Sequence, residues 1–160
     1  MPGFIGAIGK ILPVFNKEER IKLLQQTVSG SGYCVERRTL NKFLLDKVFV
    51  DRQDFLIVTE GVILNSVELV QKYNTTNMEE CIVVMYRALG ETFFNAFRGS
   101  FSGVLYDKAN EKWIIYTNHI GDKQVFYSEL NGSLLFGSEM RFMVETLKAN
   151  NLPVTLNNTG

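Results

Sequence analysis

The sequence predicts an α+β fold, a four-layer αββα sandwich in which two antiparallel sheets pack on each other with helices outside. Two observations carry this prediction. Apolar, β-rich runs occur on both sides of residues 77–97, whose apolar residues have helical spacing. Residues 101–138 then hold four β-rich runs separated by short loops rich in Gly, Asn and Asp, which are hairpin signatures. At 160 residues, the chain suits one domain with a sizeable core.

The N-terminal elements are predicted to be a strand and a helix. Residues 3–12 are mostly apolar and are followed by Pro13, which is typical of a strand that ends there. Residues 16–28 begin with a capping-box pattern and continue with apolar residues at helical spacing. The capping residues of this helix are Asn16 and Glu19, and the side chains expected to face the core are Ile21, Leu24 and Val28.

The middle of the chain mixes short strands and helices. Glycines at 30 and 32 end the first helix, and residues 33–51 contain two short strand-like runs. Residues 54–64 are apolar and β-branched around a single Gly, which predicts a strand, a turn and a second strand. Ser66 is expected to cap a short helix, and residues 77–97 are expected to form two helical segments separated at Gly90.

The C-terminal half gives the clearest pattern. The four β-rich runs predict an antiparallel meander with strands at 101–107, 112–118, 124–129 and 134–138. A helix over 139–150 follows and ends at a run of Asn and Pro. We therefore expect one domain over residues 1–150 and a linker over residues 151–160.

Composition argues against several classes of function. The 17 Lys and Arg residues balance the 17 Asp and Glu residues, so no charge footprint for nucleic acid or an anionic membrane emerges. No apolar run approaches the roughly 20 residues that cross a bilayer, and the chain start lacks the features of a signal peptide. We expect a cytoplasmic protein with neither nucleic-acid nor membrane partners.

Metal and phosphate sites are not predicted either. Cys34 and Cys81 have no metal or redox spacing, and His119 has no Cys or His cluster around it. "GAIGK" lacks both the spacing and the Ser or Thr of a phosphate-binding loop. Cys81 is expected to be a buried apolar residue, whereas Cys34 stays open as an alternative nucleophile.

The start of the chain, "MPGFIGAIGK", raises a separate question, because removal of Met1 would leave Pro2 with a free secondary amine. One interpretation is the start of an edge strand, where Pro is tolerated because it has no N–H to donate. The other is a catalytic base, as in tautomerases resembling macrophage migration inhibitory factor.

Five stretches in one order carry a family resemblance. "FRGSFSGVLYD", "TNHIGDKQVFY" and "LLFGSEM" resemble the patterns L-x-G-x-F-A-F-x-L-Y-D, D-R-x-G-x-K-P-L-Y-Y and L-x-F-A-S-E-I-K of the asparagine synthetase family. "EGVILNSVEL" is similar to its N-G-E-I-Y-N-x-x-E-L, and "MPGFIGAIGK" to its M-C-G-I-x-G start. The residues that match the first three of these patterns are Gly99, Phe101, Leu105, Tyr106, Asp107, Gly121, Lys123, Tyr127, Phe136, Ser138 and Glu139.

The chain thus resembles the N-terminal class II glutamine amidotransferase domain of that family, which implies an N-terminal nucleophile hydrolase sandwich. In the family, a Cys after the initiator Met attacks the glutamine amide while its own α-amino group acts as base. Pro2 occupies that position here. Glu60, Gly61 and Val62 occupy the N-G-E positions, where only Gly61 keeps its oxyanion-hole role and a carboxylate at Glu60 would repel the oxyanion.

The remaining substrate-binding positions also depart from the family. Met78 aligns with the Asp that holds the glutamine α-amino group, and either Arg37 or Arg38 is left as the Arg for the glutamine carboxylate. Matched residues outside the N-G-E segment are expected to serve the scaffold. The resemblance therefore implies an amidotransferase-like domain that has lost its glutaminase activity.

Two alternatives stay open. One is an active glutaminase whose natural nucleophile at position 2 has been substituted, and the other is a non-enzymatic structural or regulatory module. The resemblance implies a C-terminal synthetase domain of the same protein as partner, with ATP and magnesium needed only there and no cofactor in this chain. It also admits glutamine and a second copy of the chain, as a homodimer, among the partners.

Overall fold

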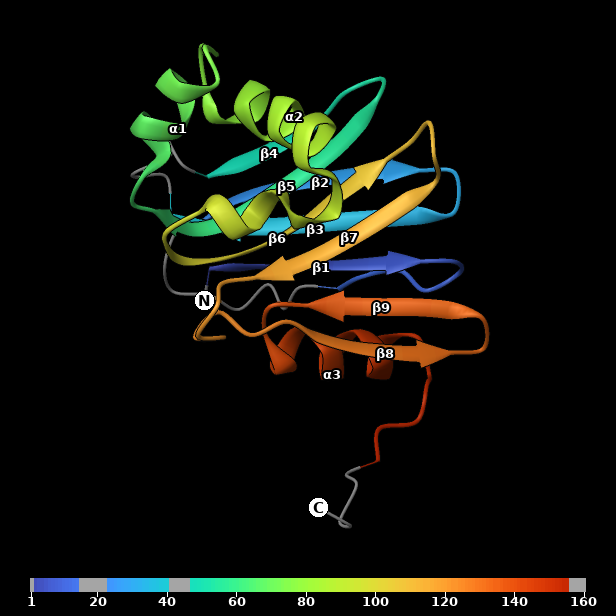
Figure 1. Ribbon diagram of the computed structural model, residues 1–160. Helices are drawn as coiled ribbons and strands as arrows, with labels where there is room; N and C mark the ends of the chain where they lie inside the picture. Colours follow the sequence, from blue (N-terminus) through green and yellow to red (C-terminus); the bar gives the residue numbers. More distant parts are fainter. Residues whose placement is uncertain (1, 15–22, 41–46, 156–160) are drawn as a thin grey trace. The chain divides into compact units, whose positions relative to one another are not determined.

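The computed structural model describes residues 2–14, 23–40 and 47–155, which carry colours in Figure 1. These residues form two compact units. The first unit holds the described residues of Met1–Thr39 and Phe126–Gly160, and the second holds those of Leu40–Val125. Each unit is built on one antiparallel sheet and carries helices, so the predicted α+β class is confirmed.

The sheet of the first unit has five strands in the order β2-β3-β1-β9-β8, with antiparallel pairing throughout. One helix, α3, follows the last strand along the chain. The bounds are β1 Gly3–Ile8, β2 Leu24–Gly30, β3 Tyr33–Thr39, β8 Phe126–Leu130, β9 Ser133–Gly137 and α3 Met140–Ala149.

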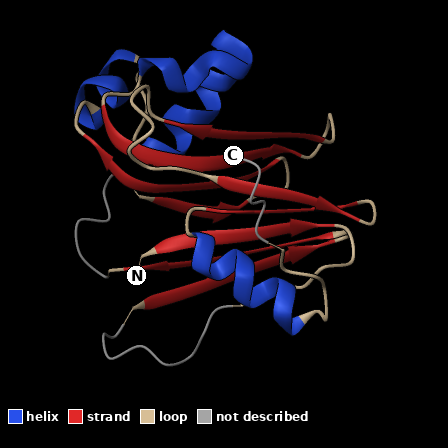
Figure 2. Cartoon of the chain, turned by 90° about the horizontal axis from the view of Figure 1, so that it is seen from below, coloured by secondary structure: helices blue, strands red, loops and turns tan. Residues whose placement is uncertain are grey.

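Strand β1 is the central strand of this sheet, and Gly3 to Ala7 are buried. Helix α3 lies across one face of the sheet (Figure 2). There Phe142 and Met143 of the helix pack with Ile5 and Ala7 of β1 in one apolar cluster. Burial on both faces explains why β1 is a continuous apolar run rather than an alternating one.

The sheet of the second unit has four strands in the order β4-β5-β6-β7. Its helices α1 and α2 and its short 3₁₀ helix η1 connect β5 to β6 (Figure 1). The bounds are β4 Val48–Asp51, β5 Phe55–Ile63, α1 Ser66–Lys72, α2 Met78–Leu89, η1 Gly90–Ala96, β6 Gly99–Asp107 and β7 Lys112–Thr117.

The core of the second unit lies between the helices and the sheet. Helix α2 begins at a capping Asn77, whose side chain accepts a hydrogen bond from the N–H of Glu80 at 2.9 Å. Its buried face, which includes Ile82 and Met85, packs with strand residues in one cluster. Phe93 sits among aromatic rings there and meets Tyr116 edge to face at a centroid distance of 5.2 Å.

The helix predicted over 16–28 is wrong in its second half. Leu24 and Val28 lie in strand β2, where Leu24 is exposed and Val28 only half-buried, so neither faces the core. The reason is the two-residue turn after Gly30, in which Gly32 adopts φ +76° and folds β3 back onto β2. Asn16, Glu19 and Ile21 lie outside the described residues.

The predicted strand, turn and strand over 54–64 are one strand, β5. Gly61 adopts φ +119° but stays in register opposite Phe101, so the chain does not turn there.

The predicted four-stranded meander is also wrong, since these four strands form two separate hairpins. β6 and β7 pair with β5, whereas β8 and β9 join the other sheet through the pairing of β9 with β1. The pairing of β9 with β1, which is distant in sequence, thus replaces the predicted pairing of β8 with β7.

Two smaller predictions are corrected as well. Pro2 does not begin an edge strand, because it precedes the central strand β1. Ser66 is the first residue of α1 and does not cap it, and the preceding Asn65 uses its side chain to bind Ala96 and Arg98. The helical segments on either side of Gly90 are confirmed, the second as a 3₁₀ turn. No helix in the described ranges is long and apolar enough to span a membrane.

Candidate functional site

The predicted site residues are divided between the two units. Pro2, Arg37 and Arg38 belong to the first unit. Glu60, Gly61, Val62 and Met78 belong to the second.

Pro2 is exposed and directly precedes β1. The start of that strand is held by Ser138, one of the residues that match the family pattern. Its Oγ accepts a hydrogen bond from the N–H of Phe4 at 3.0 Å, and its N–H donates to the carbonyl oxygen of Phe4 at 3.0 Å. The strand that would present a nucleophile at position 2 is therefore fixed in place, while position 2 itself has no nucleophilic side chain.

Arg37 and Arg38 are both buried but point to opposite faces of the sheet, because successive residues of a strand alternate. Arg38 lies opposite Gly3, and a Cβ built on Gly3 would point toward the ring of Phe142 in α3, so Arg38 is on the side of that helix. Arg37 lies opposite Phe4 on the other face and donates a hydrogen bond to Gln26. Only one of the two arginines can therefore contribute to any single site.

Charge near Arg38 is balanced locally. Burial raises the pKa of Glu36, and the neighbouring Arg38 guanidinium opposes that rise. Because Glu36 and Arg38 are two residues apart on β3, their side chains share one face. Arg38 thus has a nearby acidic group of its own strand, which favours a structural role for it.

Glu60 is paired with a buried lysine. Its Oε1 lies 3.8 Å from the Nζ of Lys47, and each side chain is about nine-tenths buried. Continuing the β4–β5 register by one pair beyond Val48 and Thr59 places Lys47 directly opposite Glu60. The carboxylate that the sequence places at the oxyanion position therefore comes with its own counter-charge, contributed by the neighbouring chain segment.

Lys47 is the residue that the sequence interpretation missed. It precedes β4 in a region whose strands were not placed from the sequence. Its partner could be found only from the register of the β4–β5 hairpin, which the sequence does not specify. On the other side of Glu60, the register places Ser102 of β6 and then Thr117 of β7, so a row of polar residues crosses this sheet.

Gly61 has a steric requirement of its own. A Cβ built on Gly61 would lie 2.8 Å from the Cα of Phe101 and closer still to the carbonyl oxygen of Ser100. In the ladder with β6, the N–H of Leu64 bonds to Arg98 and the N–H of Lys108 bonds to Asp54. These bonds show that the even-numbered residues of β5 form the hydrogen-bonded pairs with β6, because such pairs alternate along an antiparallel ladder. Gly61 is odd-numbered, so its N–H does not bond to β6.

Val62 and Met78 differ in exposure. Val62 is 46% exposed, whereas Met78 is 3% exposed and belongs to the apolar core beneath α2. Met78 thus packs in the apolar interior of the second unit.

The other groups singled out from the sequence are two cysteines and one histidine, which differ in their surroundings. Cys81 is fully buried within α2, as predicted, and burial raises the pKa of its thiol. Cys34 is half-buried in β3, and its Sγ accepts a hydrogen bond from the Oγ of Ser29 at 3.3 Å. His119 is exposed in the turn after β7, and no group of metal-ligating side chains occurs in the described part of the chain.

Asp107, another residue that matches the family pattern, stabilises the β6–β7 hairpin. It accepts hydrogen bonds from the Oη of Tyr86 at 3.0 Å and from the Nδ2 of Asn110 at 2.7 Å. Burial alone would raise the pKa of Asp107, but these hydrogen bonds and those from backbone N–H groups lower it. Burial and Asp107 together raise the pKa of Tyr86 to about 12. Asp107 therefore serves the scaffold.

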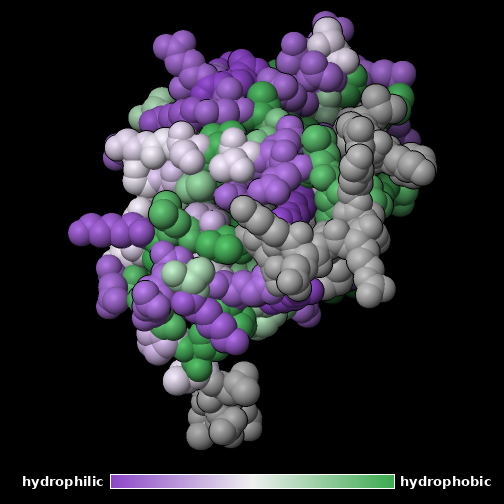
Figure 3. Space-filling view, turned by 180° about the vertical axis from the view of Figure 1, so that it is seen from behind, coloured by the Kyte–Doolittle hydropathy of each residue, from purple (hydrophilic) through white to green (hydrophobic). Residues whose placement is uncertain are grey.

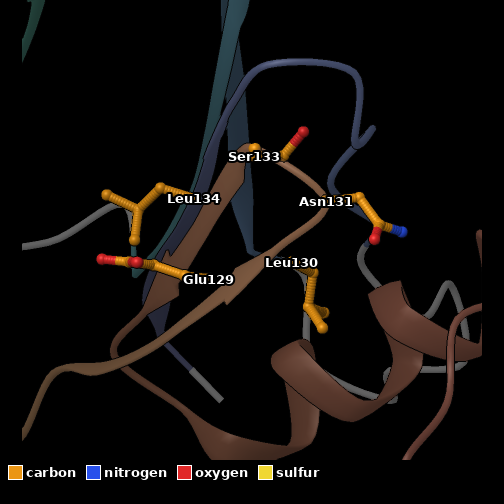
Figure 4. A pocket seen from close by; sticks show the side chains of 6 residues that line it. Glu129, Leu130, Asn131, Ser133 and Leu134 are labelled. Carbon is orange, nitrogen blue, oxygen red and sulfur yellow. The ribbon is translucent and has the colours of Figure 1, made fainter.

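Two hollows of about 420 Å³ each lie away from the predicted site residues. One follows the β8–β9 hairpin, where Ser133 accepts a hydrogen bond from the N–H of Lys10 (Figure 4). The other lies beside Asp107, where the Nη2 of Arg87 contacts Asp54 at 3.1 Å. In both, these polar groups already bind one another. Hydrophilic and hydrophobic residues are interspersed on the described part of the face in Figure 3.

Comparison with known proteins gives a consistent result. The model of the glutamine amidotransferase domain family matches residues 47–145. The chain is 28% identical over 138 residues to a protein of Methanocaldococcus jannaschii assigned as glutamine-hydrolysing asparagine synthetase 2, covering 82% of the chain and 26% of that protein. It is 32% identical over 91 residues to glutamine-hydrolysing asparagine synthetase 2 of Bacillus subtilis, covering 54% of the chain and 12% of that protein.

A solved structure shows the same fold. Glutamine phosphoribosylpyrophosphate amidotransferase from B. subtilis, complexed with ADP and GMP, matches with a TM-score of 0.57 at 11% identity. The match covers 89% of this chain and 37% of that one. This likeness confirms the predicted fold type, that of the N-terminal nucleophile hydrolases. The chain spans only about a quarter or less of the length of both matched asparagine synthetases.

Proposed function

Because the chain belongs to the glutamine amidotransferase domain family of asparagine-synthetase-like proteins, we propose that it is a member that no longer hydrolyses glutamine. The observation that carries this proposal is Pro2 at the start of the central strand β1. Hydrolysis of an amide by this family's route requires a side-chain thiol that forms an acyl-enzyme. Proline has no side-chain nucleophile, so that intermediate cannot form at position 2.

The electrostatics of the second unit support the same proposal. An oxyanion hole works because donors are aimed at the charge that develops in the transition state. Glu60 instead brings a carboxylate to the position of the donor Asn, and its pairing with Lys47 makes the local charge close to neutral. The N–H of Gly61 is the one family donor that keeps its residue type, and a single backbone donor without a nucleophile gives little rate acceleration.

Glutamine hydrolysis measured as glutamate release tests the proposal directly. We expect the chain with Pro2 and its Pro2→Ala variant to give the same rate as buffer. A rate for the chain with Pro2 clearly above that of Pro2→Ala would overturn the proposal. Restoring the family residues together, as Pro2→Cys with Glu60→Asn and Val62→Glu, is expected to raise release above that of Pro2→Cys alone.

An active glutaminase whose natural nucleophile has been substituted is the second candidate. The ordered start of β1, held by two hydrogen bonds between Ser138 and Phe4, favours it, because a Cys at position 2 would be attached to a fixed strand. In that case Pro2→Cys alone should hydrolyse glutamine at a rate well above Pro2→Ser. Our proposal instead predicts that both single variants stay near the buffer rate, since Glu60 remains.

As a non-enzymatic module, the domain over residues 1–150 would act as a structural or regulatory partner of a synthetase domain that uses free ammonia. In this proposal the chain itself binds neither ATP nor magnesium, and residues 151–160 link it to that domain. Glutamine should then leave the melting temperature of the chain unchanged up to millimolar concentration, with glutamate as the matched control ligand. A glutamine-specific rise would count against the module.

A further inference from the structure

Strand β2 is an outer strand of the five-stranded sheet and is open to solvent. Among the residues that the structure describes, only β3 pairs with it. Five of its seven residues are exposed, including Gln25, Thr27 and Ser29. Outer strands carry unpaired backbone donors and acceptors along one side, which makes them templates for further pairing.

The ladder shows which groups of β2 point outward. The N–H of Gly9 donates to the carbonyl oxygen of Gly32, which continues the β1–β3 register. Hydrogen-bonded pairs alternate in an antiparallel ladder, so the even-numbered residues of β3 bond to β1. The N–H of Ser138 donates to the carbonyl oxygen of Phe4, so the even-numbered residues of β1 bond to β9, which is consistent with this alternation. The intervening residues of β3 bond to β2. The residues of β2 left with N–H and C=O groups on the outer side are Gln25, Thr27 and Ser29.

The composition of β2 differs from that of the other outer strands. β4 contains Asp51, β7 contains Lys112 and β8 contains Glu129. β2 reads Leu-Gln-Gln-Thr-Val-Ser-Gly and contains neither a charged residue nor a proline. Charges and prolines are the usual devices that keep outer strands apart. β2 is therefore the one outer strand of the described sheets without either device.

We propose that β2 is a dimerisation edge that pairs antiparallel with β2 of a second copy of the chain, with Thr27 on the twofold axis. Pairing about Thr27 brings Gln25 opposite Ser29 of the other copy. The outward N–H and C=O groups of Gln25, Thr27 and Ser29 then each bond to the other copy, so each of these backbone donors meets an acceptor. The inference does not depend on whether the domain hydrolyses glutamine.

A second copy suits this edge better than a charged partner does. A neutral strand places no like charges across the twofold axis, where they would face one another directly. The facing side chains are Gln with Ser and Thr with Thr, which can hydrogen-bond across the pair. Two five-stranded sheets would join into one continuous sheet. Because one strand pair buries less surface than a standard interface, we expect a weak, concentration-dependent dimer.

Cysteine cross-linking tests both the edge and its register, in the 160-residue chain with Cys34→Ser throughout. Thr27→Cys should form a disulfide-linked dimer under oxidised glutathione, because residues at a hydrogen-bonded pair have Cα atoms about 5.5 Å apart. Gln25→Cys is the matched control, since its copies would lie roughly 13 Å apart along the strands. A mixture of Gln25→Cys and Ser29→Cys chains should cross-link to each other. Cross-linking of Gln25→Cys as fast as Thr27→Cys would overturn the register.

A charge placed on the axis tests the association itself. Sedimentation velocity over a concentration series should show a monomer–dimer equilibrium whose dissociation constant rises about fivefold in Thr27→Lys, which places two like charges face to face. Gln71→Lys adds the same charge on the exposed surface of α1 and should leave the constant unchanged. A chain that stays monomeric at all concentrations, or equal constants for the two variants, would overturn the proposal.

Discussion

Replacing Gly61 by Ala should destabilise the second unit strongly, for reasons independent of catalysis. Gly61 has φ +119°, a region that costs a residue with a Cβ about 1–3 kcal/mol. The added methyl would also lie 2.8 Å from the Cα of Phe101 and nearer to the carbonyl oxygen of Ser100, both backbone atoms that cannot rotate away. Displacing a packed backbone adds about 1–3 kcal/mol. We therefore expect a loss of about 2–6 kcal/mol in the free energy of unfolding.

The matched control is Gly90→Ala in the same unit. Gly90 also has a positive φ, +66°, but nothing lies within 4 Å of the position that its Cβ would take. Its substitution should cost only the backbone strain, about 1–3 kcal/mol, because φ 66° with ψ −145° lies near a region that only glycine adopts readily. Urea unfolding followed by circular dichroism gives both values, provided that the m-values stay equal.

The comparison decides why Gly61 is present. If Gly61→Ala were no less stable than Gly90→Ala, the steric argument would be refuted, and the glycine would need another explanation. If the difference is as large as expected, the close approach of β5 to β6 is sufficient reason for a glycine. Its match to the family pattern would then not by itself indicate a working oxyanion hole.

Three further outcomes are expected. Glu60→Gln should lower the free energy of unfolding by about 3 kcal/mol, because it removes the carboxylate from the buried ion pair with Lys47; the double variant with Lys47→Met should recover most of this loss, and no recovery would contradict the pairing. The depressed pKa of Asp107 means that its carboxylate stabilises the fold fully above its unfolded pKa of about 3.9 and loses that effect as pH falls through the lower folded value. Asp107→Asn should thus be less stable than the natural sequence at pH 7, with a gap in urea midpoint that narrows below about pH 4; a gap constant down to pH 2 would refute this. Ellman's reagent should modify Cys34 in the native protein and reach the fully buried Cys81 only on unfolding, so equal rates for the two thiols would show that the α2 core opens.

The sequence predicts the local elements well where their signals are local. The helical spacing within residues 77–97 is confirmed in α2, and the helix over 139–150 is confirmed in α3. It fails where a local signal competes with distant pairing. Leu24 and Val28 fit a helical pattern, yet pairing with β3 makes their segment a strand. Gly61 signals a turn, yet β6 holds it within one strand.

The candidate site shows the same division. The absence of a side-chain nucleophile at Pro2 and the core character of Cys81 follow from residue identity alone, because they depend on which atoms a side chain has. The pairing of Lys47 with Glu60 and the opposite faces of Arg37 and Arg38 do not, because they depend on strand register.

What the sequence by itself determined is the class of the fold, the family resemblance and the absence of a thiol at position 2. What only the tertiary structure decided is which strands share a sheet, which charge balances Glu60, why Gly61 must be a glycine and which strand, β2, is left as an open neutral edge. The physical reason is the separation along the chain over which each interaction acts. Caps, turns and side-chain chemistry act within a few residues, whereas ladder hydrogen bonds and packing join residues such as Ile5 and Gly137, whose proximity no local pattern encodes.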